Sequence, residues 1–115
     1  MFLKGPETAT QRKLAEHLAQ GDSPKRREEF VHAMFERYLT LMGEAIKKHD
    51  PNHLNLGIRF GGSPAPAIQR MGRMFDVCSV NIYEYEPTRQ LKALYAATGR
   101  PLIIGEFHLG VPADG

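Results

Sequence analysis

The spacing of apolar residues divides the chain into a helical first part and an alternating second part. Leucines four positions apart within residues 10–20 predict a helix that Gly21 can close. The Ser-Pro pair at 23–24 is typical of a helix start, so we expect a second helix from there to about residue 49. Its apolar side chains recur every three or four positions on one face: Val31, Met34, Phe35, Tyr38, Leu41, Met42, Ala45 and Ile46.

From residue 54 onward, short apolar runs alternate with helical segments. We expect strands at residues 54–60, 77–83 and 102–106, and helices at 67–75 and 88–98. Strands that alternate with helices in this way form a parallel sheet through right-handed crossovers. The pattern therefore predicts an α/β fold with about three parallel strands.

The two faces of the expected strands differ in polarity. On one face we expect aliphatic side chains, and on the other small or polar ones. An open sheet with helices on both sides needs apolar residues on both faces, so a closed barrel whose interior opens into a polar site fits better. The aliphatic set is Leu54, Leu56, Ile58, Cys78, Val80 and Ile82, and the opposite set is Asn55, Gly57, Arg59, Ser79, Asn81 and Tyr83.

Composition excludes several classes of protein. The 115 residues are 42% hydrophobic and 24% charged, which is ordinary for a globular domain. A net charge of +2 is too weak to indicate a nucleic-acid partner, and the single cysteine, Cys78, excludes an internal disulfide. No run approaches the roughly 18 apolar residues of a membrane span. Residues 1–5 contain no signal-peptide core, so we expect no membrane partner, and the sequence leaves the localisation open.

Motifs for metals and phosphates are also missing from the sequence. His49 and His53 are four positions apart, but a proline and a turn separate them, so they do not share a helix face. The glycines at 61–62 follow an expected strand, yet the prolines at 64 and 66 break the spacing of a phosphate-binding loop. We therefore expect no metal and no cofactor.

Side chains capable of chemistry gather where the expected strands end. Arg59, Tyr83 and Glu106 each finish a separate strand, and carboxyl ends of parallel strands meet at one edge. Asn81 lies one pleat below Tyr83, and His108 follows Glu106. A tyrosine hydroxyl beside a carboxylate holds it in place and keeps it ionised, which suits a nucleophile or a base. The alternative is that Glu106 is only a solvated residue at a strand terminus.

Three segments carry a resemblance to a known family. The runs Arg37–Phe60, Asp76–Tyr83 and Ile104–His108 resemble (β/α)8-barrel glycoside hydrolases, in particular agarase-like and β-galactosidase-like enzymes with catalytic acids on strands four and seven. The resemblance covers residues 30–110. It implies an incomplete TIM (β/α)8 barrel in which the three strands are the fifth, sixth and seventh. Residues 1–115 would then form a single partial catalytic domain, with residues 1–29 as a helical lead-in.

The resemblance also implies roles for the residues at the strand ends. Glu106 matches the nucleophile of a retaining mechanism, and Tyr83 matches the tyrosine that hydrogen-bonds it. Arg59, Asn81 and His108 would line the sugar subsites. The implied partner is an oligosaccharide or polysaccharide with β-galactosidic or related linkages.

One departure from the family pattern is large. The acid/base glutamate of these enzymes usually follows an asparagine on the fourth strand, and the sequence contains no Asn-Glu pair. Retaining hydrolysis needs two carboxyl groups about 5–5.5 Å apart. We therefore expect a fragment that is inactive alone, with the missing strands supplied by the rest of a parent chain. The alternative is a small non-catalytic α/β domain that binds carbohydrate or protein through the same strand ends.

Overall fold

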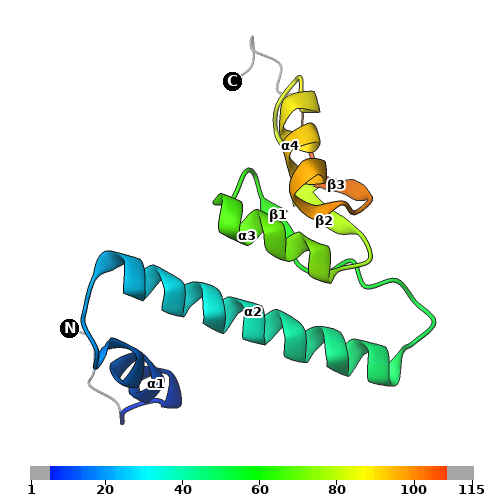
Figure 1. Ribbon diagram of the computed structural model, residues 1–115. Coiled ribbons are helices and arrows are strands. Elements are labelled where there is room, and N and C mark those ends of the chain that lie inside the picture. The colour runs from blue at the N-terminus through cyan, green and yellow to red at the C-terminus, as the bar shows by residue number, and fades with distance from the viewer. Residues whose placement is uncertain (1–5, 109–115) are drawn as a thin grey trace. The chain divides into compact units, whose positions relative to one another are not determined.

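The computed structural model describes residues 6–108, whose helices and strands are labelled in Figure 1. These residues form two compact units that divide between Arg37 and Tyr38. The first unit contains α1 (Ala9–Leu18) and the start of α2 (Pro24–His49), and the rest of α2 belongs to the second unit. Both helices were predicted from the sequence and are confirmed. Within residues 6–108, no helix combines the length and the apolar content that a membrane crossing requires.

Local hydrogen bonds fix where the two long helices begin. The Thr8 hydroxyl accepts a hydrogen bond from the Gln11 backbone N–H at 3.2 Å, and the Gln11 side chain accepts one from the Thr8 N–H at 2.6 Å. This reciprocal pair is a capping box, which the sequence-based reading overlooked. The hydroxyl of Ser23 accepts from the Arg26 N–H at 3.2 Å, so Ser23 caps α2 as predicted.

The second unit is a parallel sheet with helical crossovers. Strands β1 (Arg59–Gly61), β2 (Cys78–Asn81) and β3 (Leu102–Glu106) are parallel and lie in the order β1-β2-β3. The first crossover contains α3 (Pro66–Met71) and the short 3-10 helix η1 (Gly72–Met74), and the second contains α4 (Thr88–Thr98). The three parallel strands and four α-helices found within residues 6–108 confirm the predicted α/β class.

The core lies on one face of this sheet. Cys78 and Val80 are almost completely buried, which confirms the aliphatic face predicted for β2. Glycine is required at position 72, because an added Cβ would lie 2.7 Å from the Thr98 methyl group and 2.9 Å from the Cys78 sulfur. The other buried apolar side chains are Leu39, Phe60, Phe75, Ile82 and Leu94.

The first strand differs from its prediction. The alternation of leucines predicted a strand at 54–60 with Leu54 and Leu56 packed under helices, but these side chains are 68% and 47% exposed, and Asn55 is buried. The Asn55 side-chain oxygen accepts a hydrogen bond from the Gly57 N–H at 2.8 Å, and Gly57 has a φ of +63°. The chain therefore turns at this point, and only Arg59–Gly61 pairs with β2.

The remaining boundaries follow their predictions with small shifts. The helix expected at 67–75 is α3 continued by η1, and the strand expected at 77–83 is limited to Cys78–Asn81. Helix α4 and strand β3 have the predicted bounds. Gly99 ends α4 with a φ of +62°, and its N–H donates to the Tyr95 carbonyl at 2.7 Å, as expected for a glycine C-cap.

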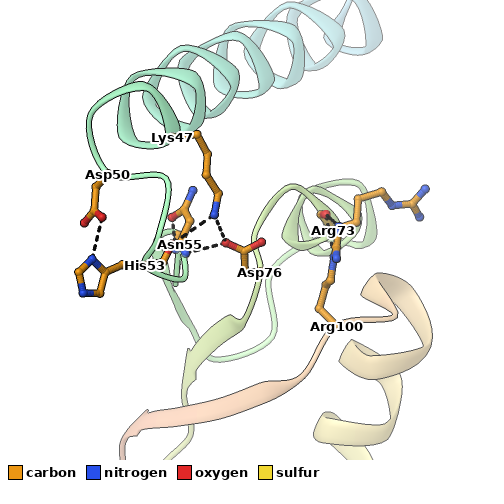
Figure 2. A network of polar contacts seen from close by, with 8 residues as sticks. Lys47, Asp50, His53, Asn55, Arg73, Asp76 and Arg100 are labelled. Carbon is orange, nitrogen blue, oxygen red and sulfur yellow. Dashed lines mark hydrogen bonds and ion pairs between the residues drawn. The ribbon is translucent and has the colours of Figure 1, made fainter.

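A polar network at the amino end of the sheet holds the turn before β1 in place (Figure 2). The Asp76 carboxylate accepts a hydrogen bond from the Asn55 N–H at 2.7 Å and lies 3.0 Å from the Lys47 ammonium at the end of α2. The Asn55 carbonyl in turn accepts from the Asp76 N–H at 2.9 Å, and Lys47 donates to the His53 carbonyl at 3.2 Å. The hydrogen bond from Asn55, followed by the contact with Lys47, lowers the pKa of the Asp76 carboxyl.

A second set of contacts in this view joins η1 to the end of α4 (Figure 2). The Arg100 guanidinium donates two hydrogen bonds to the Arg73 carbonyl, at 3.0 and 2.8 Å. The Arg73 guanidinium donates to the Ala97 carbonyl at 3.2 Å. These bonds satisfy carbonyl groups that the ends of helices leave without partners.

Candidate active site at the carboxyl ends of the strands

The direction of the Glu106 side chain depends on an irregularity in β3. Val80 pairs with Ile104, but the next residue, Asn81, pairs with Glu106, so Gly105 is the extra residue of a β-bulge. Simple alternation would place Glu106 on the same face as Ile104. The bulge turns it instead to the face of Asn81, which is the polar face of the sheet.

The carboxylate of Glu106 has a separate partner for each oxygen. The Arg59 guanidinium forms an ion pair with Oε1, and the Tyr83 hydroxyl donates a hydrogen bond to Oε2. Glu106 is the last residue of β3 and Tyr83 lies two residues beyond β2, but Arg59 is the first residue of β1 and does not finish its strand as predicted. The structure still brings the three side chains together, because Arg59 reaches Glu106 from the start of its strand. About half of the Glu106 side chain is exposed, at 50%, which leaves it open to a ligand.

The electrostatics of the cluster keep Tyr83 in its donor form. The hydrogen bond to Glu106 raises the pKa of the Tyr83 hydroxyl above its usual value of 10.0. Ionised Tyr83 would have no proton to donate and would repel the neighbouring carboxylate. Tyr83 therefore stays protonated and remains a donor to Glu106 at neutral pH.

Asn81 and His108 lie beside this cluster. Within residues 6–108, the amide oxygen of Asn81 is buried and has no hydrogen-bond partner. A buried acceptor of this kind is costly unless a donor reaches it. The Asn81 side chain also forms a hydrogen bond with the Tyr83 hydroxyl, which offsets part of the rise in the Tyr83 pKa. The ring of His108 lies 5.5 Å from the ring of Tyr83, centroid to centroid, and its side chain is exposed.

Gly105 and Ser79 are two small residues beneath Arg59 that were not identified from the sequence as part of the site. A Cβ added at Gly105 would lie 3.0 Å from the Arg59 Cδ and 3.0 Å from the Ser79 hydroxyl oxygen. Gly105 was not among the candidate residues named from the sequence. The signal that would have found it is a glycine next to a candidate nucleophile, where β-bulges often redirect a side chain.

The described part of the chain supplies one carboxylate to the cluster. Arg59 and Tyr83 are the polar partners of Glu106 within residues 6–108. The Glu86 carboxylate instead accepts a hydrogen bond from the Thr88 N–H at 3.1 Å, at the start of α4, and contacts with Thr88 lower its pKa. Residues 6–108 also contain no group of three side chains able to hold a metal ion.

The fold and the cluster define a mixed α/β protein with Arg59, Tyr83 and Glu106 in contact on one face of a parallel sheet. No protein-family model matches the sequence, and no solved structure matches it. The chain is similar to beta-agarase A of Vibrio sp. (strain JT0107), with 32% identity over 90 residues. The match covers 69% of this chain and 9% of the agarase, so the chain spans only a small part of that relative. This likeness supports a glycoside hydrolase-like region.

Proposed function

We propose that this chain is part of a retaining glycoside hydrolase in which Glu106 is the nucleophile and Tyr83 positions it. The observation that carries the proposal is the arrangement around Glu106: one carboxylate oxygen is held by Arg59 from β1 and the other by Tyr83 from the segment after β2, while half of the side chain stays exposed. A fixed, ionised and accessible carboxylate is what nucleophilic attack on a sugar requires. The partial likeness to beta-agarase A supports the same class of reaction.

The reaction has two balanced steps. A Glu106 oxygen forms a bond to the anomeric carbon while the glycosidic C–O bond breaks, and the leaving oxygen takes its electron pair and a proton from a carboxylic acid. Water then attacks the anomeric carbon and gives its proton to the carboxylate formed in the first step. The bond to Glu106 breaks, which restores the Glu106 carboxylate, and no cofactor is needed.

The second carboxyl group has to come from outside the described residues. We propose that the three strands are the fifth to seventh of a (β/α)8 barrel and that other parts of a larger polypeptide supply the remaining strands and the acid. Within residues 6–108, β1 and β3 each pair only with β2, so each has one open edge that a closed barrel would occupy. The isolated chain is therefore inactive.

The proposed substrate is a polysaccharide with β-galactosidic or related linkages. The similar protein, beta-agarase A, is by its name an enzyme that acts on agar, a polysaccharide. The exposed ring of His108 offers a polar contact for a sugar hydroxyl, and the Asn81 side chain contacts the Tyr83 hydroxyl beside it. In this assignment Asn81 and His108 line the sugar subsites, and Arg59 lies at their edge.

The test is a pair of substitutions in the full-length polypeptide that contains this chain. Glu106→Gln removes the charge but keeps the shape, and we expect turnover of a β-galactosidic substrate to fall by about 10⁴-fold or more. Glu84→Gln is the matched control, because Glu84 is an exposed carboxylate next to Tyr83, whereas the contacts described for Glu106 within residues 6–108 are with Arg59 and Tyr83. Turnover that survives in Glu106→Gln would contradict the assignment.

A non-catalytic carbohydrate-binding domain is the second candidate. The exposed aromatic side chains Tyr83, Tyr85 and Phe107 favour it, at 52%, 76% and 73% exposure, because aromatic rings are common contact surfaces for ligands. If the chain is such a domain, wild type and the Glu106→Gln variant should bind the polysaccharide with the same affinity, and neither should turn over substrate.

A further inference from the structure

The ion pair at the site joins two strands that are not neighbours. Arg59 lies on β1 and Glu106 on β3, with β2 between them. Adjacent strands are about 4.8 Å apart, so the Arg59 side chain has to cross roughly 10 Å of sheet to reach the carboxylate. Its backbone partner on β2 is Ser79, which is therefore the residue that it crosses.

The path across β2 is open only because the residues beneath it are small. A Cβ at Gly105 would lie 3.0 Å from the Arg59 Cδ, 3.2 Å from its Nε and 3.0 Å from the Ser79 Oγ. Carbon atoms in contact normally sit about 3.5–4.0 Å apart, so any side chain at 105 would push the Arg59 stem away. Gly105 is also the bulge residue that turns Glu106 toward Arg59.

We propose that Arg59 is a positioning residue for the nucleophile: it reaches Glu106 through a passage left by Ser79 and Gly105 and fixes the plane of the carboxylate together with Tyr83. This inference rests on the proposed function, and it replaces a direct role for Arg59 in holding the sugar. A carboxylate held at both oxygens keeps one orientation, whereas a carboxylate held by Tyr83 alone can rotate about its own axis.

The charge of Arg59 also bears on the second step of the proposed reaction. Glu106 is neutral while it is esterified to the sugar and becomes negative again when water breaks that ester. A guanidinium fixed beside Oε1 stabilises the charge as it returns. Arg59 therefore acts on Glu106 in both steps without touching the substrate.

The experiment uses an activated 2-deoxy-2-fluoro-galactoside, which traps the glycosyl-enzyme, on the full-length polypeptide. For Arg59→Ala we expect the maximal labelling rate to fall by about 10- to 100-fold, as for the loss of a charged hydrogen bond. The half-saturating probe concentration should stay within about 3-fold of wild type, because Arg59 does not contact the sugar. Arg59→Lys should recover part of the rate, since it keeps the charge but not the planar fork.

The passage is tested separately at Gly105. Gly105→Ala should lower the labelling rate in the same way as Arg59→Ala, and the double variant should lose little more than Arg59→Ala alone. Gly61→Ala is the matched control, because a Cβ there would meet no atom within 4 Å. We expect Gly61→Ala to label at the wild-type rate.

The outcomes separate this inference from the proposed function. If wild type is labelled and Arg59→Ala is labelled equally fast, or loses only affinity for the probe, then the positioning role is wrong while the nucleophile stands. If wild type is not labelled at all, the proposed function fails and the inference fails with it. Should Arg59→Ala not fold, Arg59→Met decides the question, since it keeps an unbranched apolar stem and removes only the charge.

Discussion

Gly57 is the glycine of this fold at which an added methyl group should be most disruptive. Gly57 has a φ of +63°, and a Cβ added there would lie only 2.3 Å from ring carbons of Phe75. Phe75 is 3% exposed and its ring lies 6.3 Å from that of Phe60, so it has little room to move. The Gly57→Ala variant therefore has to distort the turn, displace a core ring, or both.

Two contributions set the size of the effect. A left-handed conformation costs an ordinary residue about 1–2 kcal/mol, and overpacking of a core costs about 1–3 kcal/mol. Together they give about 2–5 kcal/mol, a large share of the roughly 5–15 kcal/mol by which a domain is stable. Gly62→Ala is the control, because Gly62 has a φ of +65° and a Cβ there would meet nothing within 4 Å. It should lose only about 1–2 kcal/mol.

The assay is the urea dependence of thiol labelling at Cys78 in the full-length polypeptide, with the modified peptide identified by mass spectrometry. Cys78 has no exposed surface and its burial raises the pKa of the thiol, so the reagent reports unfolding of this sheet alone. The excess cost of Gly57→Ala over the control should shrink when Phe75 is replaced by leucine. Equal costs for Gly57→Ala and Gly62→Ala would refute the steric argument.

Two further predictions concern charged and hydrogen-bonded groups. The pKa of the Asp76 carboxyl is lower in the folded chain than its usual value of 3.8. The ionised carboxylate therefore stabilises the fold above pH 3.8, and this stabilisation is lost as the pH falls through the lowered pKa of the folded chain. Acid unfolding of Asp76→Asn, followed by Cys78 labelling, should therefore lack this part of the pH dependence, and an unchanged profile would contradict the role of the Lys47 and Asn55 contacts. Tyr83→Phe should lower turnover by about 10- to 100-fold, because it removes a donor to a charged acceptor, and should leave the thermal unfolding midpoint nearly unchanged. A large fall in that midpoint with little loss of turnover would show that the hydroxyl serves the fold instead.

Elements with strong local signals could be predicted from the sequence. The Ser-Pro start of α2 and the glycine after α4 mark their ends through short-range hydrogen bonds, and both helices have the expected bounds. The segment before β1 could not be predicted, because the alternation of Leu54 and Leu56 imitates a strand. A turn made by the Asn55 side chain overrides that alternation, and its contacts with Asp76 come from a distant part of the chain.

The candidate site was predictable in its members but not in its geometry. Carboxyl ends of parallel strands meet at one edge, which brings Tyr83 and Glu106 together, whereas Arg59 begins β1 and reaches Glu106 across the sheet. The face on which Glu106 lies depends on the bulge at Gly105, and alternation alone gives the wrong face. The pairing of Arg59 with Glu106 depends on strand order and register, which no local pattern of residues contains.

The most direct test of the central claim is to locate the trapped sugar. The full-length polypeptide is inactivated with the 2-deoxy-2-fluoro-galactoside, digested, and sequenced by mass spectrometry to find the modified residue. We predict one added glycosyl group, on Glu106, and none in Glu106→Gln. A stable glycosyl group on another carboxylate, with Glu106 unmodified, would contradict the assignment of Glu106 as the nucleophile.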